Sequence, residues 1–217
     1  MNFQNVLSKT QSGTDEWYTT RESVNLIVPY LKMGGVRRVL CPFDKAESNF
    51  VRVLTEQGFD VTYSHIDTGT DFFEINNLND YDAIVSNPPF SKREQILPRL
   101  FESNVPFAMI LNFNGLFDSN TRWHLFKDNE FELLIPNGRM GFFGDNYVTS
   151  QPSHQSIYVC RGILPKQIVF NGNVTRASAR EEVATYLKAK QDQSTEDDQI
   201  EGQMDITMFL GKEWKSW

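Results

Sequence analysis

Hydrophobic positions follow two spacings in turn along the chain, one typical of strands and one typical of helices. Short apolar runs bounded by turns, which indicate buried parallel strands, occupy 36–41, 82–86 and 106–111. Further strand-like segments lie at 59–67, 132–135, 140–143, 156–160 and 167–170. Apolar residues at helical intervals predict helices over 20–32, 47–57, 91–101 and 119–128. This alternation predicts an α/β chain with a doubly wound, mostly parallel, Rossmann-like sheet and an antiparallel terminal portion.

Local signals mark the starts of two of these helices. Thr19 and Glu22 have the spacing of a capping box, and Pro29 predicts a kink within the helix that follows. Ser91 and Glu94 repeat the same spacing, so we expect the helix after the 82–86 strand to begin at Ser91.

The chain divides into an arm, a domain and a tail. Residues 1–16 are polar and predict an N-terminal arm, and 17–180 hold the predicted strands and helices. Residues 181–217 carry nine acids against four lysines, which accounts for most of the net charge of −7. A helix over about 179–190 and a partly flexible acidic tail are expected there.

Composition limits the class of protein. With 40% hydrophobic and 13% aromatic residues the chain is expected to be globular, and no apolar run reaches the roughly 18 residues of a membrane span. No basic segment followed by an apolar one begins the sequence, so we expect no signal peptide and a cytoplasmic location. The two cysteines and three histidines have no metal-ligand spacing, and no metal is expected.

The most distinctive chemistry directly follows the 82–86 strand. Asn87 offers a side-chain carbonyl, Pro88 a backbone carbonyl that is free of the ladder, and Phe90 a ring face, while Pro89 stiffens the turn. Together these groups suit a planar ligand that bears an NH2 group, such as a nucleobase. The alternative is a strand that simply ends in a proline turn.

Several short words occur in an order that resembles a known family. They are Trp17-Tyr18-Thr19, Cys41-Pro42-Phe43-Asp44, Glu47-Ser48-Asn49-Phe50, Ser64-His65-Ile66, Asp71-Phe72-Phe73, Ser86-Asn87-Pro88-Pro89-Phe90-Ser91 and Cys160-Arg161-Gly162. From about Trp17 to about Phe170 the chain resembles small adenine-specific methyltransferase-like proteins of bacteriophages and mobile elements, which have a class I methyltransferase fold. The Asn-Pro-Pro-Phe word resembles the catalytic motif of amino-group methyltransferases that use S-adenosylmethionine, whose acceptors are adenine N6, cytosine N4 or protein glutamine.

The resemblance implies a catalytic motif of Asn87, Pro88, Pro89 and Phe90 and a cofactor site on the preceding segments. The implied cofactor residues are Tyr18, Thr19, Pro42, Phe43, Asp44, Asn49, Asp67, Asp71 and Phe72. Asp67 is also expected on general grounds, because an acid at the end of the second strand of a nucleotide-binding unit can hold both ribose hydroxyls.

The first loop departs from the family pattern. Cys41 stands where the family has an acid, and Lys45-Ala46-Glu47 stand where it has glycines. Asp44 and Asn49 are candidates for the methionine end of the cofactor, and the alternative is that they begin a helix. Asp71 likewise has an alternative role as a helix cap that precedes core phenylalanines.

Contacts to nucleic acid are expected near the motif. Lys92, Arg93 and Arg99 are the candidate phosphate contacts, together with a polar acceptor-facing loop at 144–154 whose residues Tyr147–His154 are expected to be mobile. Solvated charges on a helix are the alternative for the three basic residues. The overall negative charge predicts no long-range attraction to nucleic acid.

The resemblance therefore predicts a methyltransferase for an exocyclic amine, with adenine N6 in DNA as the expected acceptor and S-adenosylmethionine as the cofactor. RNA and protein glutamine are alternative acceptors, and a protein partner is an alternative source of sequence specificity. A catalytically degenerate fold that acts as a binding or inhibitory module is the non-enzymatic alternative, suggested by the glycine-free loop and the acidic charge. If the chain is phage-encoded, the expected location is the host cytoplasm.

Overall fold

The computed structural model describes residues 18–144, 147–149, 155–175, 181, 182, 184, 185 and 188. The chain separates into two units, 1–179 and 180–217. In the second unit the described residues are helical, whereas the predicted arm at 1–16 and most of the acidic tail lie outside the described residues. None of the helices in the described ranges is both long and apolar enough to cross a membrane.

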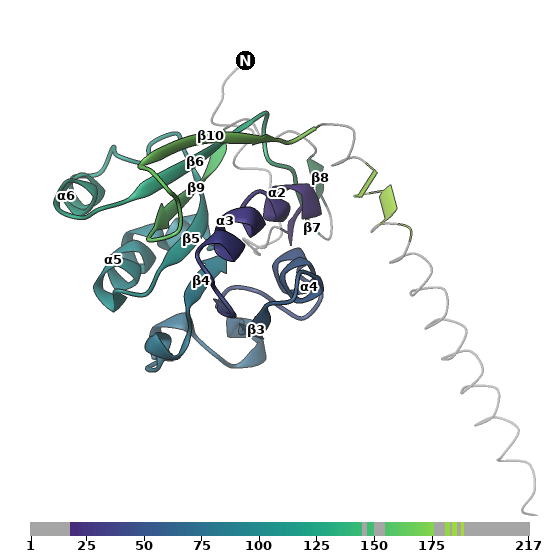
Figure 1. Ribbon diagram of the computed structural model, residues 1–217, viewed down its shortest axis with the longest axis horizontal. Helices are drawn as coiled ribbons and strands as arrows, with labels where there is room; N and C mark the ends of the chain where they lie inside the picture. Colours follow the sequence, from purple (N-terminus) through teal and green to yellow (C-terminus); the bar gives the residue numbers. More distant parts are fainter. Residues whose placement is uncertain are drawn as a thin grey trace, which may run out of the picture. The chain divides into compact units, whose positions relative to one another are not determined.

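A seven-stranded sheet forms the centre of the first unit (Figure 1). Its order is β10 (Ile168–Asn173), β6 (Glu132–Asn137), β9 (Ser156–Arg161), β5 (Phe107–Asn112), β4 (Ala83–Ser86), β2 (Arg38–Cys41) and β3 (Asp60–Tyr63). Only β9 runs antiparallel to its neighbours in this sheet. The predicted α/β class, with a mostly parallel sheet and an antiparallel portion late in the chain, is therefore confirmed.

Helices cover both faces of this sheet (Figure 1). Helices α2 (Arg21–Asn25), α3 (Val28–Met33) and α4 (Asn49–Glu56) share one buried cluster, and α5 (Arg93–Ser103) and α6 (Asn120–Asp128) contribute to the other. Along β5, Ala108 and Ile110 belong to the first cluster, whereas Met109 and Leu111 belong to the second. This alternation follows from the two-residue period of a strand and explains why the run at 106–111 is apolar throughout.

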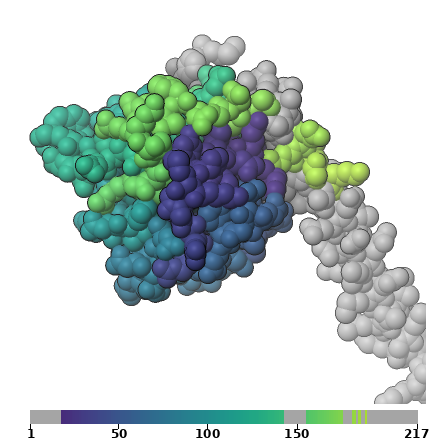
Figure 2. All heavy atoms as spheres, in the orientation of Figure 1, coloured from purple at the N-terminus to yellow at the C-terminus, as the bar shows by residue number. Residues whose placement is uncertain are grey.

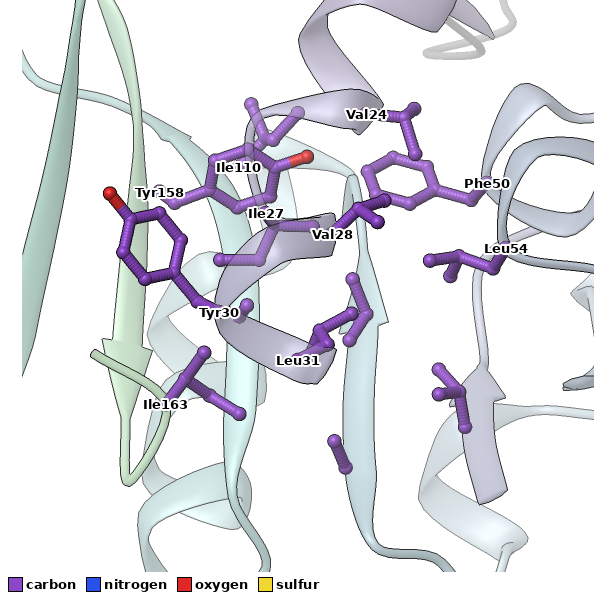
Figure 3. Packing of buried hydrophobic residues seen from close by; sticks show 14 of the residues in the cluster. Val24, Ile27, Val28, Tyr30, Leu31, Phe50, Leu54, Ile110, Tyr158 and Ile163 are labelled. Carbon is purple, nitrogen blue, oxygen red and sulfur yellow. The ribbon is translucent and has the colours of Figure 1, made fainter. Parts of the chain in front are cut away.

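The first cluster forms where α2 and α3 lie on the sheet, with Ile27 and Leu31 pointing towards the strands (Figure 3). Tyr158 of β9 is fully buried there, and its hydroxyl donates to the Ser23 carbonyl at 3.1 Å. On the outside, the purple α2–α3 segment occupies the middle of one surface, beside the light-green segment that contains β10 (Figure 2).

Two helix starts differ from the predictions. The helix predicted over 20–32 is two short helices, because Pro29 has no N–H to donate to Asn25 and the chain breaks between α2 and α3. Thr19 is not the cap, since it lies in a strand and Thr20 precedes α2. Ser91 is not a cap either, because 90–92 form the 3-10 turn η4 (Phe90–Lys92), in which the Lys92 N–H donates to Pro89 O at 3.0 Å.

A second, three-stranded antiparallel sheet has the order β1 (Tyr18–Thr19), β7 (Phe142–Gly144) and β8 (Tyr147–Thr149). The expectation of a loop throughout 144–154 was wrong for 147–149, which pair with β7. Residues 145, 146 and 150–154 lie outside the described residues, so the predicted mobility of this segment stays a prediction there.

The amino ends of β2 and β4 are joined by one carboxylate. Asp82 Oδ2 accepts hydrogen bonds from the backbone N–H groups of Arg37 and Arg38 at 3.0 and 2.9 Å, and Oδ1 accepts from Arg38 Nη2 at 3.0 Å. These bonds hold the pKa of the Asp82 carboxyl at about 2, well below its usual value. The contacts fix the register of the two strands where they begin.

Candidate functional site at the carboxyl ends of β2 and β4

The strand order reverses direction between β2 and β4. From β2 the chain passes through α4 to β3 on one side, whereas from β4 it passes through α5 to β5 on the other side and over the opposite face. Such a switch point opens a crevice outside the carboxyl ends of the two strands, where open α/β sheets bind ligands. Both segments with candidate chemistry, the loop after β2 and the Asn-Pro-Pro-Phe word after β4, leave the sheet here.

The Asn-Pro-Pro-Phe word directly follows a buried strand, as the sequence predicted. All four residues of β4 are buried, and the strand ends directly before Asn87. Asn87 is half-buried with its Oδ1 atom shielded from solvent, and Pro88 is buried. Phe90 is half-buried and packs against the cluster on the α5 side of the sheet. The catalytic role of these residues stays a prediction.

Asp44 connects the two sides of the switch point. Its carboxylate accepts one hydrogen bond from Ser48 Oγ, at the start of α4, and another from Ser86 Oγ, the last residue of β4. The side chain is 7% exposed, and burial raises the pKa of this carboxyl to about 6, although the two hydroxyl hydrogen bonds oppose the rise. Asp44 thus joins β4 to the loop after β2. Its expected role at the helix start or in cofactor binding is separate from this contact.

Ser48 and Ser86 were not among the candidate residues. Ser48 caps α4, because its Oγ accepts from the Phe50 N–H at 3.1 Å while its own hydroxyl donates to Asp44. Ser48 could have been found from its place near a predicted helix start, where serine is a preferred capping residue, four residues after Asp44. The signal for Ser86 was a hydroxyl at the last position of an otherwise apolar strand, where a fully buried polar group needs a partner.

The structure brings the predicted residues Tyr18, Thr19 and Asn49 together beside this loop. Asn49 is buried, and its Nδ2 donates to the backbone carbonyl of Thr19 at 2.8 Å. Tyr18 Oη lies 3.5 Å from Glu47 Oε1. Within the described part of the chain the buried hydroxyl of Thr19 makes no hydrogen bond. Asn49 therefore ties β1 to the start of α4.

Asp67 lies beyond the end of its strand rather than within it. The strand predicted over 59–67 ends at Tyr63, and Asp67 belongs to the 3-10 turn η1 (Ile66–Thr68), which His65 caps by accepting from the Asp67 N–H at 3.1 Å. Lys45 Nζ lies 2.8 Å from Asp67 Oδ2, and the Asp67 side chain is 55% exposed. The Lys45 side chain is 22% exposed, so the pair is only partly open to solvent, and a ligand hydroxyl would have to displace the lysine to reach this oxygen of Asp67.

The aromatic candidates form a small packed group. The rings of Phe43 and Phe72 have centroids 5.0 Å apart, and the Arg99 guanidinium lies 5.1 Å from the Phe72 centroid. Asp71 caps the turn η2 (Phe72–Glu74) by accepting from the Phe73 N–H at 3.0 Å, which matches the structural alternative for this acid. Pro42 is buried directly after β2. Contacts of these residues to a cofactor stay predictions.

The three candidate phosphate contacts do not form one group. Lys92 is exposed and Arg93 is half-buried, and both come shortly after the Asn-Pro-Pro-Phe word, beyond Ser91. Arg99 lies further along α5, where it packs on Phe72 and donates to the Ile75 carbonyl. Its position favours a structural role, and Lys92 and Arg93 remain the candidates next to the motif.

Comparisons with known proteins found distant likenesses of fold. No family model matches the chain, and no curated protein sequence matches it. Among solved structures it is similar to precorrin-6y C5,15-methyltransferase from Geobacter metallireducens GS-15, with 12% identity, a TM-score of 0.37, and coverage of 64% of this chain and 85% of that chain. It is also similar to a modification subunit of a putative type I restriction enzyme from Vibrio vulnificus YJ016, with 11% identity and a TM-score of 0.42. That match covers 85% of this chain and spans 55% of the other. Likenesses of this size carry no conclusion about activity.

Proposed function

We propose that this chain transfers a methyl group from S-adenosylmethionine to an exocyclic amine of a nucleobase, with adenine N6 in DNA as the acceptor. One observation carries the proposal: Asn87-Pro88-Pro89-Phe90 leaves a fully buried strand at the switch point of the sheet. Asp44 binds both Ser86 and Ser48, and this couples the word to the loop expected to hold the cofactor.

The residues after β4 suit an amine acceptor. Asn87 Oδ1 is shielded from solvent, so its side chain would have to turn towards the acceptor. Oδ1 and the Pro88 carbonyl oxygen would then each accept one N–H of the amine, which turns its lone pair away from both carbonyls. Phe90 offers a ring face on which the base can stack, and a base from a duplex would have to be flipped out to reach it. The pyrrolidine rings fix φ at both prolines, which restricts the turn that carries these groups. Catalysis of this kind consists of positioning and electrostatics.

The opposite wall of the crevice fits the cofactor in part. When bound, S-adenosylmethionine supplies an electrophilic methyl group on a sulfonium. Asp67 is exposed after β3 and would accept hydrogen bonds from the ribose hydroxyls once Lys45 moves away. Asp44 contacts Ser48 and Thr19 contacts Asn49, so both residues lie at the start of α4, where the methionine end is expected. The Thr19 hydroxyl is buried and unsatisfied, and the Asp44 carboxylate is buried. Asn49 would hold Thr19 in place for this contact.

Two contacts favour a second candidate function, a non-enzymatic module that retains the fold. Lys45, at a position where the resembling family has glycine, forms an ion pair with Asp67, and both oxygens of Asp44 already accept hydrogen bonds from the protein. If these contacts persist in solution, they occupy the two acids that a cofactor would need.

Calorimetry with S-adenosylmethionine and its demethylated product distinguishes the two candidates. The methyltransferase requires binding, and no heat of binding at millimolar ligand would favour the non-enzymatic module. Transfer of a labelled methyl group to adenine-containing duplex DNA, single-stranded DNA, RNA and protein then identifies the acceptor. Asn87→Ala should abolish transfer, whereas Asn79→Ala, an exposed asparagine near the other end of β4, is the matched control and should retain it.

A further inference from the structure

A groove of about 560 Å³ lies at the ends of β6 and β10, on the same edge of the sheet as Asn87. Four of its lining residues carry side-chain amides: Asn137, Gln155, Asn171 and Asn173. The ring of Phe170 also lines it, and no charged residue is among the lining residues that the structure describes. We call this feature the amide groove.

An irregularity in the outermost strand shapes the amide groove. The pairing of β10 with β6 shifts register between Phe170 and Asn173, which forms a bulge at Asn171 and Gly172. Gly172 has φ +83°, a backbone conformation that residues with a side chain rarely adopt, so glycine is favoured at this point of the bulge. Bulges re-aim side chains at sheet edges, and here the bulge brings Asn171 and Asn173 to the groove.

Hydrogen bonds fix the amide side chains around the bulge. Asn171 Nδ2 donates to the Tyr30 hydroxyl at 2.6 Å, which anchors β10 to α3. Asn137 Nδ2 donates to Asn173 Oδ1 at 3.0 Å, and Gln155 Nε2 donates to the Gly138 carbonyl at 2.9 Å. The bond between Asn137 and Asn173 leaves each of these two amides with further donors and acceptors for a ligand.

Phe170 has the largest exposed fraction, 77%, among the large hydrophobic side chains in the described ranges. Its register partner on β6 is Ile135, which also lines the groove. An aromatic ring beside ordered amides offers a stacking face next to hydrogen-bonding groups. This combination suits a flat, polar, uncharged group better than it suits a phosphate.

The amide groove aligns with the proposed acceptor site. The sheet order from Asn87 is β4, β5, β9, β6 and β10, and the carboxyl ends of the parallel strands share one edge. Four steps between strands of about 4.8 Å place β10 roughly 19 Å from β4. A few nucleotides of an extended strand can cover this distance.

We propose that the amide groove binds a second nucleobase of the acceptor strand, distinct from the base presented to Asn87. The proposal rests on the proposed function, because it assigns a recognition subsite to the same acceptor. Phe170 stacks on the base, and the amides of Asn137 and Asn173 pair with its edge, as asparagine and glutamine do with adenine. Because its lining is neutral, the subsite contacts the base and not the charged phosphates of the backbone.

Fluorescence anisotropy with labelled single-stranded oligonucleotides of about twelve nucleotides tests this subsite without cofactor. Deoxy and ribo forms are each compared with an abasic strand of equal length. Phe170→Ala should weaken binding of the base-containing strand by about 5- to 150-fold and leave binding of the abasic strand unchanged. Phe170→Leu, which keeps apolar bulk but loses the ring, should weaken it similarly. Ile168→Ala is the matched control, being 45% exposed on the same strand but outside the groove, and should change affinity less than about twofold.

Three results would overturn the subsite: no binding of either base-containing strand by the unmodified protein, equal affinity for base-containing and abasic strands, or unchanged affinity in both Phe170 variants. The failures of the two proposals are distinguishable. If the protein transfers no methyl group yet loses base-dependent binding in Phe170→Ala, the subsite stands and the methyltransferase is refuted. If Phe170→Ala transfers methyl groups with an unchanged KM for the oligonucleotide, the methyltransferase stands and the subsite is refuted.

Discussion

Replacing Asp44 by asparagine removes an ionisable group from the switch point and keeps a planar side chain of the same size. Burial raises the folded-state pKa of this carboxyl from 3.8 to about 6. The folded state therefore holds the proton more tightly than the unfolded state, and the free energy of unfolding falls as pH rises through this interval. A difference of roughly two pKa units corresponds to about 3 kcal/mol.

The expected result is a pH-dependent difference between two otherwise similar proteins. Of this total, the protein with Asp44 should lose about 2 kcal/mol relative to Asp44→Asn between about pH 4 and about pH 6, and above about pH 7 the difference should be constant. Urea unfolding followed by circular dichroism, at closely spaced pH values from about 4 to about 8, gives both curves. Parallel curves over that range would refute a buried, ionisable Asp44.

Asp82→Asn is the control for this experiment. The pKa of Asp82 is lowered to about 2, so its contribution to stability is present above about pH 4 and is lost only as pH falls below that value. The Asp82→Asn curve should therefore run parallel to that of the unmodified protein from about pH 4 to about pH 8. A slope change in that range would mean that the assay does not isolate Asp44.

Four further predictions concern the proposed activity. Asp67→Ala should weaken S-adenosylmethionine binding by about 1.5–3 kcal/mol in calorimetry, because a charged acceptor of two hydroxyls is lost; unchanged affinity would remove Asp67 from the cofactor site. Phe90→Ala should cost about 1–3 kcal/mol of base stacking, measured as oligonucleotide affinity. Asn87→Ala should leave cofactor affinity and folding nearly unchanged while transfer is lost, and wild-type turnover would contradict the motif assignment. Joint replacement of Lys92 and Arg93 by Glu should reduce nucleic-acid affinity and flatten its salt dependence; equal affinity at low salt would identify them as solvated helix charges.

Most of the fold could be predicted because its signals are local. The buried strands at β2, β4 and β5 are continuous apolar runs, and two-residue alternation assigns their side chains to opposite faces. The predicted start of α5 was wrong. Pro89 and the turn at 90–92 delay the helix, and the spacing of a capping box does not reveal such a turn. The strand β8 was missed because it lies within the mostly polar segment 144–154, and its pairing with β7 has no local pattern in the sequence.

The candidate site was predictable as a location and less so as a set of contacts. Strand ends at a switch point follow from the order of elements, so the loop after β2 and the word after β4 were expected to meet. The partner of Asp44 on β4, Ser86, lies 42 residues away along the chain, and no local pattern indicates such a pair. The ion pair between Lys45 and Asp67 likewise depends on how two loops fold against each other.

The two strands that carry the proposed chemistry are tied at both ends by carboxylates, Asp82 where they begin and Asp44 where they finish. Breaking either tie alone leaves the other in place, so β2 and β4 should open to solvent as one cooperative unit rather than fray from an end. Their amides are then expected among the slowest to exchange with deuterium. A frame of this kind sets the separation of the two walls of the crevice before any ligand arrives, so binding would not have to create that separation.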